Sequence, residues 1–200
     1  MTVAVQSQDM SQDRRRHDKY DRLVAVAQSL PKLKVAVAHP CDAASLGAVF
    51  EATDLGLIEP ILVGPQARIT ATAAALGKDV SAMRIVDAQH SHAAAEAAVD
   101  LVRSGQAEAL MKGSLHTDEL MGAIVRREGG LRTARRISHC FVMDVPTHET
   151  ALIITDAAVN IAPTLEDKVH IVQNAIDLAR ALRVDPVRVA ILSAMETVNP

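Results

Sequence analysis

Aromatic residues are almost missing from this chain of 200 residues, which has no Trp, one Tyr and two Phe. Proteins that bind single-stranded nucleic acid stack its bases on aromatic side chains, so this class of function is disfavoured. Apolar residues still make up 49% of the chain, so its core must consist of Ala, Val, Leu and Ile. Such a core is typical of helices that cover a parallel sheet.

Cysteine and net charge are also low. The two cysteines, Cys41 and Cys140, cannot form a disulfide framework, and they fit the reducing cytoplasm. A net charge of −3 gives no reason to expect a polyanionic partner. No apolar run approaches the ~18 residues of a membrane span. Residues 1–17 are polar and resemble no signal peptide. We therefore expect a cytoplasmic protein with a disordered tail over 1–17, and neither a membrane nor a nucleic acid as partner.

Short apolar runs alternate with helical patterns along the rest of the chain. The predicted strands cover 33–38, 60–64, 83–88, 107–114, 137–145, 151–155 and 187–194. Strands that alternate with helices indicate an α/β fold, here an α/β/α sandwich with a mostly parallel sheet. We predict a first α/β domain over 18–148 and the start of a second one over 149–200.

The stretch 151–194 is predicted to form one βαβ unit with parallel strands and a right-handed crossover. Thr164 is the predicted N-cap of its helix, and Asp167 would complete a capping box. One helical face would be buried, formed by Leu165, Val169, Val172, Ile176 and Ala179. Parallel strands normally have helices on both sheet faces, and the chain stops shortly after the last predicted strand. We therefore expect the second domain to be incomplete.

Polar residues end the predicted strand 151–155, namely Thr155 and Asp156, with Asn160 close behind. Ligands of open α/β sheets bind beyond the carboxyl ends of the strands. The next predicted strand also ends in polar residues, Ser193 and Glu196. Two interpretations stay open: the polar groups contact a ligand, or Asp156 forms an Asx-turn and Asn160 satisfies loop backbone.

The segment LMKGSLHTDEL at 110–120 carries Lys112 and Ser114 from a strand end to a helix with Thr117 as its predicted N-cap. An ammonium, hydroxyls and helix-terminal amides together suit a phosphate or a carboxylate. The order of residues is not that of a Walker loop. A solvated strand end explains the segment equally well.

Five arginines fall within RREGGLRTARR at 126–136. They could clamp an anionic ligand through their guanidinium groups. They could also be a solvated helix end, where cations are favoured. The histidines and cysteines at 39–41, 90–92 and 139–140 lack the spacing of a metal motif, so no metal site is expected.

Several segments together resemble the phosphate acetyltransferase/phosphate butyryltransferase family. They are LMKGSLHTDEL, LRTARRISHCFVMDVP, LIITDAAVNIAPTLEDKVHIVQNAIDLA and VAILSAMETV, in this order. The resemblance runs from about Tyr20 to the last residue. HPCD and GLIEPILVGP resemble the branch of the family in which some members carry an added hydratase domain.

The resemblance implies transfer of an acyl group, expected to be acetyl, between coenzyme A and phosphate, without a covalent enzyme intermediate. It implies two α/β domains around a cleft, as in isocitrate and isopropylmalate dehydrogenases, and a homodimer. Coenzyme A and phosphate would be substrates, and no cofactor or metal is expected. Donors and orienting groups for the acyl phosphate would be Lys112, Ser114, Arg132, Ser138, Thr155, Asp156 and Asn160.

The Ser, Arg and Asp that perform the chemistry in the family are expected beyond Pro200, so this chain alone is expected to be inactive. Phosphate butyryltransferase activity stays open as an alternative, because pocket volume decides between acetyl and butyryl. A non-catalytic module that senses acyl-CoA is a second alternative. A decarboxylating dehydrogenase of the same fold is a third, but it would need an aspartate cluster that the sequence lacks.

Overall fold

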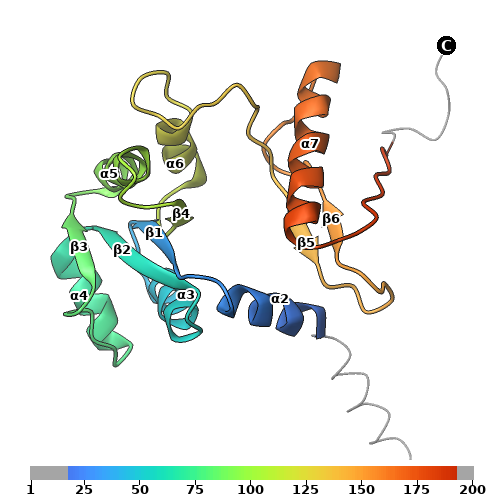
Figure 1. The fold of residues 1–200 in the computed structure, drawn as a ribbon. Helices are drawn as coiled ribbons and strands as arrows, with labels where there is room; N and C mark the ends of the chain where they lie inside the picture. The colour runs from blue at the N-terminus through green and yellow to red at the C-terminus, as the bar shows by residue number, and fades with distance from the viewer. Residues whose placement is uncertain (1–17, 193–200) are drawn as a thin grey trace, which may run out of the picture. The chain divides into compact units, whose positions relative to one another are not determined.

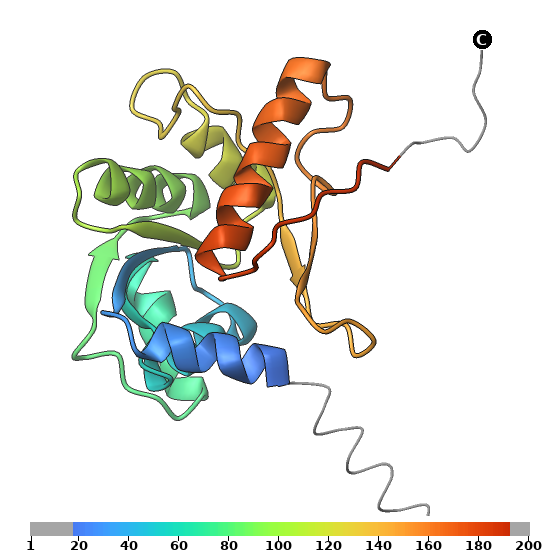
Figure 2. The ribbon, with the colours of Figure 1, turned by 45° about the vertical axis from the view of Figure 1, so that its right-hand side comes forward.

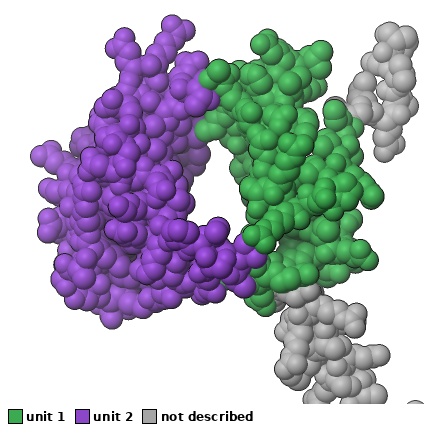
Figure 3. Space-filling view, in the orientation of Figure 1, with its two compact units in different colours: residues 1–24, 134–200 green, residues 25–133 purple. Residues whose placement is uncertain are grey.

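The computed structural model describes residues 18–192, and the chain divides into two compact units. Unit 1 comprises residues 1–24 and 134–200, and unit 2 comprises residues 25–133 (Figure 3). Helix α2, Asp18–Gln28, contributes to both units. The predicted tail over 1–17 lies outside the described residues, as do Ser193 and Glu196. No helix within residues 18–192 is long and apolar enough to cross a membrane.

Unit 2 is built on a parallel sheet of four strands in the order β3-β2-β1-β4 (Figure 1). The strands are β1 Leu33–Ala38, β2 Ile58–Gly64, β3 Arg84–Asp87 and β4 Ala109–Lys112. The central strand β1 is buried on both faces over residues 35–38. The α/β class and the parallel sheet predicted from the sequence are therefore confirmed.

Four helices cover this sheet: α3 Ala43–Asp54, α4 Gln66–Ala75, α5 Ser91–Arg103 and α6 Thr117–Ile124. Successive strand residues point to opposite faces, so the core is split into two halves. Ala36 and Val63 pack in one half with residues of α5 and α6. Val37 and Leu62 pack in the other half with residues of α3 and α4. The ribbon shows α5 and α6 on one face of the sheet and α3 and α4 on the other (Figure 2). Unit 2 is thus an α/β/α arrangement, and its core consists almost entirely of aliphatic side chains.

The described part of unit 1 contains a two-stranded antiparallel sheet and a long helix, besides the start of α2. The strands are β5 Phe141–Met143 and β6 Leu152–Ile154, and the helix is α7 Leu165–Ala181. The predicted parallel βαβ unit over 151–194 is wrong, because β6 pairs with β5 and residues 187–192 form no strand. The connection between β5 and β6 is short, which allows an antiparallel pair but not a parallel one. Residues 193–194 of the predicted strand lie outside the described residues.

Helix α7 begins as predicted but buries a different face. Thr164 and Asp167 form the predicted capping box, in which each side chain accepts from the other residue's backbone N–H. The predicted face is wrong in its first half, because Leu165 is 81% and Val169 60% exposed, whereas Ile171 is 6% exposed. His170 and Asn174 of α7 bind the backbone of Arg136, so a polar side of the helix also packs against the chain. Ala179, in the second half of the predicted face, is buried at 4% exposed.

The predicted domain boundary after residue 148 falls inside unit 1, between two strands that pair with each other. Division into domains there would separate β5 from its only strand partner within residues 18–192. The boundaries of the compact units instead follow residues 24 and 133.

Candidate functional site

The candidate site in unit 2 lies at the carboxyl ends of β1 and β4, which are neighbours in the sheet. The chain proceeds from β1 to β2 and β3 on one side, and then returns to place β4 on the other side of β1. Ligands of open α/β sheets bind at such a topological switch point. The residues that follow the two strands are 39–42 and 113–116.

Ser114 ties the two loops together. Its Oγ lies 3.1 Å from Nδ1 and 2.9 Å from the carbonyl oxygen of His39, and it accepts from the N–H of Cys41 at 3.3 Å. The preceding Gly113 permits this approach, because a Cβ there would lie 2.4 Å from the carbonyl oxygen of Ala38. The predicted binding residue Ser114 therefore has an internal structural role.

Charged side chains gather around this junction. Hydrogen bonds from Ser45 hold the pKa of Asp42 below its usual value, with the cations of Arg68 and Lys112 adding to the effect. Lys112 is exposed, and the one bond of its Nζ within residues 18–192 is a long one of 3.4 Å to the Gly113 carbonyl. This ammonium is therefore open to a ligand.

Helix α6 starts at this junction too. Its N-cap is His116, one residue before the predicted Thr117, and no side chain caps it. Asp118 and Glu119 lie in its first turn, where carboxylates interact favourably with the helix dipole. Its first backbone amides thus have no side-chain acceptor at the N-cap.

The arginine cluster at 126–136 contains both paired and free guanidinium groups. Three of the five form ion pairs with carboxylates, namely Arg126, Arg135 and Arg136. Arg127 and Arg132 are exposed and form no hydrogen bond or ion pair with any residue of 18–192. Arg132 is therefore free to bind an anion, but so is Arg127.

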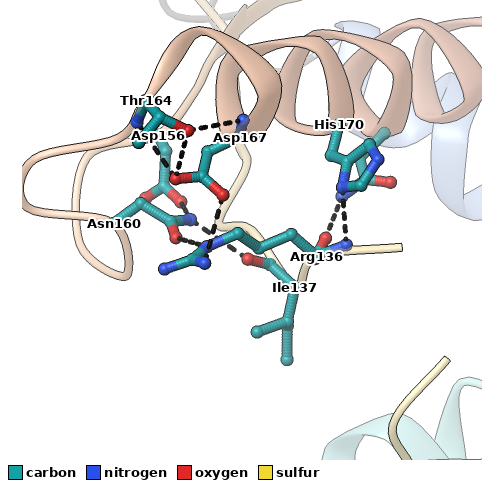
Figure 4. A network of polar contacts seen from close by, with 8 residues as sticks. Arg136, Ile137, Asp156, Asn160, Thr164, Asp167 and His170 are labelled. Carbon is teal, nitrogen blue, oxygen red and sulfur yellow. Dashed lines mark hydrogen bonds and ion pairs between the residues drawn. The ribbon is translucent and has the colours of Figure 1, made fainter. Parts of the chain in front are cut away.

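In unit 1, Asp156 is saturated with hydrogen bonds, of which Figure 4 shows the one from Asn160. One carboxylate oxygen accepts from the N–H groups of Ala158 and Val159, at 3.0 and 2.9 Å. The other accepts from His139 N–H at 3.2 Å and from the Asn160 side chain. Burial alone would raise the pKa of Asp156, but these bonds outweigh it and lower the pKa to about 2. The Asx-turn interpretation of Asp156 is correct, and the carboxylate also fixes the segment before β5.

Asn160 and Arg136 extend this network (Figure 4). The Asn160 amide donates to the carbonyl of Ile137 at 3.0 Å, and its oxygen accepts from Nε of Arg136 at 2.7 Å. The same guanidinium lies 3.1 Å from Asp167, the capping residue of α7. Asn160 thus satisfies loop backbone, as the second interpretation expected, and connects the loop to the helix.

The remaining predicted residues of unit 1, Thr155 and Ser138, differ in whether their hydroxyl proton already has an acceptor. The hydroxyl of Thr155 donates to the carbonyl of His139 at 2.6 Å. The hydroxyl of Ser138 accepts from Asn174 at 2.8 Å, and its own proton has no acceptor within residues 18–192. Of these two, only Ser138 keeps a donor for a ligand.

The seven predicted residues fall into two groups, one in each unit. Lys112, Ser114 and Arg132 belong to unit 2, and the others to unit 1: Ser138, Thr155, Asp156 and Asn160. Sequence reasoning missed Arg136, Asn174 and His39. Arg136 stood in the arginine cluster, but nothing in the sequence distinguished it from its neighbours. Within residues 18–192, no three potential ligands converge to hold a metal ion.

The sequence is similar to one protein family and to individual members of it. Residues 91–200 match the model of the family described as phosphate acetyl/butaryl transferase. A phosphate acetyltransferase of Rhizobium meliloti is 58% identical over 181 residues, which cover 90% of this chain and 57% of that protein. A phosphate acetyltransferase of Rickettsia typhi is 51% identical over 178 residues, covering 88% of this chain and 51% of the relative. The chain thus spans about half the length of these relatives.

A solved structure supports the same relationship. A branched-chain phosphotransacylase from Enterococcus faecalis superposes with a TM-score of 0.67 at 28% sequence identity. The match covers 84% of this chain and 58% of the other.

Proposed function

The chain belongs to the phosphate acetyl/butaryl transferase family, and on this premise we propose that it takes part in acyl transfer between coenzyme A and phosphate. The proposed acyl group is acetyl. The observation that carries the proposal is the 58% identity with a phosphate acetyltransferase over 90% of the chain. Transfer of a butyryl group is the second candidate, since the family description includes both activities.

The reaction requires several hydrogen-bond donors. A phosphate oxygen attacks the thioester carbonyl, the new C–O bond forms, and the C–S bond breaks with release of coenzyme A. Donors must hold the phosphate oxygens and the oxyanion that develops at the carbonyl. Three of the seven proposed binding residues have donors that no acceptor of residues 18–192 fully uses: Lys112, Arg132 and Ser138. We propose that these three contact the ligand.

The other four residues are proposed to position the ligand-binding groups. Ser114 uses its hydroxyl proton on His39, Thr155 gives its own to a backbone carbonyl, and Asn160 uses both its amide nitrogen and its oxygen. Asp156 accepts only internal bonds. We propose that they act by fixing the backbone around Lys112 and Ser138.

The wider expectations from the family stay proposals. They are two domains around a cleft, a homodimer and a cytoplasmic location. Acetyl specificity also belongs here, because one methylene of the acyl chain changes binding by only about 1–3 kcal/mol.

The proposed function is tested with a chimera in which this chain replaces the matching 57% of the 58%-identical relative. We expect phosphate-dependent release of free thiol from acetyl-CoA, with a higher kcat/KM than from butyryl-CoA. Arg132→Ala should raise the KM for phosphate or coenzyme A about tenfold, and the matched control Arg127→Ala should raise it less. A folded chimera without thiol release would refute the proposal. A preference for butyryl-CoA would favour the second candidate.

A further inference from the structure

Three polar side chains of α7 hold the segment that precedes β5. They are His170, Asn174 and Asp177, whose spacing places them on one face of the helix. Nδ1 of His170 accepts from the N–H of Arg136 at 3.2 Å, and Nδ2 of Asn174 donates to the carbonyl of the same residue at 2.9 Å. Asp177 forms an ion pair with the guanidinium of Arg135. The helix thus fixes Arg136 by its backbone and Arg135 by its side chain.

Asn174 also bonds to Ser138, and its other contacts decide how its amide is oriented. Nδ2 faces the carbonyl of Arg136 and also Oγ of Ser138, which lies at 2.8 Å. Oδ1 faces the guanidinium of Arg135, 3.4 Å from Nη1. A carbonyl can only accept and a guanidinium can only donate, so the reversed amide would oppose like groups on both sides. Asn174 therefore donates to Ser138 and does not accept from it.

The direction of this bond determines what the Ser138 hydroxyl can do. A serine hydroxyl without partners rotates, and it can donate or accept. A hydroxyl that already accepts from an amide keeps its own proton for a different partner. The proton of Ser138 has no acceptor within residues 18–192, and the side chain is partly buried. Ser138 is therefore arranged to donate to an acceptor oxygen from outside the described chain.

We infer that Asn174, oriented by Arg135, is a positioning residue that keeps Ser138 as a hydrogen-bond donor for a substrate oxygen. Ser138 contacts the substrate, and Asn174 acts only through Ser138. The inference rests on the proposed function in that the oxygen belongs to phosphate or to the thioester carbonyl, both of which accept hydrogen bonds during acyl transfer. The competing explanation is that Asn174 only holds the backbone of Arg136.

Asn174→Asp tests the direction of the bond. A carboxylate oxygen in place of Nδ2 accepts the Ser138 proton and so removes the donor from the substrate. In the chimera that tests the proposed function, kcat/KM for phosphate or for acetyl-CoA should fall about tenfold, the effect of one hydrogen bond. The substrate whose kcat/KM falls more identifies the oxygen that Ser138 contacts. Ser138→Ala should cause the same loss, because it removes the same donor.

Two matched variants separate this role from a structural one. Asn174→Ala also loses the bond to the Arg136 carbonyl, but it leaves the Ser138 proton free, so kcat/KM should fall by less than about threefold. With Ser138→Ala already present, Asn174→Asp should lower kcat/KM by less than about twofold more, because no donor remains to be lost. Equal losses in Asn174→Asp and Asn174→Ala would show a purely structural role. A full tenfold loss in the Ser138→Ala background would show repulsion by the new charge. Either result would overturn the inference.

A second measurement uses the 200-residue chain without substrate. Both Nδ2 protons of Asn174 are hydrogen-bonded, one to Arg136 and one to Ser138. In ¹H–¹⁵N spectra, Ser138→Ala should therefore move one side-chain amide proton of Asn174 upfield and leave the other in place, and no movement of either would overturn the inference. The two proposals fail separately. A folded chimera without thiol release refutes the proposed function, whereas thiol release with equal losses in Asn174→Asp and Asn174→Ala refutes the inference alone.

Discussion

Asp156→Asn tests the saturated carboxylate of unit 1 most directly. Asparagine has almost the same shape but only one oxygen. Either orientation of its amide therefore directs an NH₂ group at two of the four donors that Asp156 now accepts from. One orientation opposes His139 N–H and Asn160, and the other opposes the amides of Ala158 and Val159. Loss of stability is expected in both cases.

The size of the loss follows from the pKa of Asp156. A fall from 3.8 to about 2 corresponds to an upper limit of about 2.5 kcal/mol, at about 1.36 kcal/mol per pKa unit. The carboxylate is only partly buried, and screening by solvent reduces this to about 1 kcal/mol. For a chain of this size, that is a decrease in Tm of about 2–4 °C.

The direction of the pKa shift determines how the stabilisation by Asp156 changes with pH. Because the pKa is lower in the folded protein, the stabilisation is complete well above pH 3.8 and is lost as the pH falls toward 2. Urea unfolding at pH 7 should therefore show Asp156→Asn about 1 kcal/mol less stable than the wild type, and about half of this difference should vanish by pH 3. The exposed Glu149→Gln in the same unit is the control. A difference that stays constant from pH 7 to pH 3, or no difference at pH 7, would refute the reasoning.

Two further substitutions test local structure. Gly113→Ala should destabilise unit 2 by more than about 2 kcal/mol, because its Cβ would lie 2.4 Å from the carbonyl oxygen of Ala38. The control is Gly122→Ala in α6, where nothing lies within 4 Å of the added Cβ. It should be neutral or stabilise by up to about 1 kcal/mol. Thr164→Ala should cost about 1 kcal/mol by removing the cap of α7, whereas Thr164→Ser should cost little. Chemical unfolding of all four variants measures both predictions, and equal stability within either pair would contradict the corresponding one.

The fold of unit 2 was predicted well from the sequence, because the patterns that indicate its strands and helices are local. The apolar run 33–38 has no competing pattern, and the Ala-rich segment that became α5 could only be a helix. Parallel pairing followed from the alternation of strands and helices. The position of Ser114 did not follow, because its contacts with His39 join residues 75 positions apart.

The sequence predicted unit 1 poorly because side chains replace strand pairing there. Residues 137–140 have the composition of a strand, yet only Phe141–Met143 pair with β6. The carbonyls of Ile137 and His139 and the N–H of His139 bind side chains instead. Apolar periodicity cannot reveal such bonds, because they depend on residues 16 to 23 positions further along the chain.

The polar residues after β6 can therefore have a structural role and still affect ligand binding. Asp156 and Asn160 hold residues 137–139 by their backbone, and that segment carries Ser138, which keeps a free proton. A substitution at Asp156 should thus lower the stability of the protein. It should also lower ligand affinity, because it changes the position of Ser138. Ser138→Ala removes the donor and the bond from the Asn174 side chain but none of the backbone bonds, so it should lower affinity with a smaller loss of stability than Asp156→Asn. The two variants separate contact with the ligand from positioning, which a single loss of activity could not do.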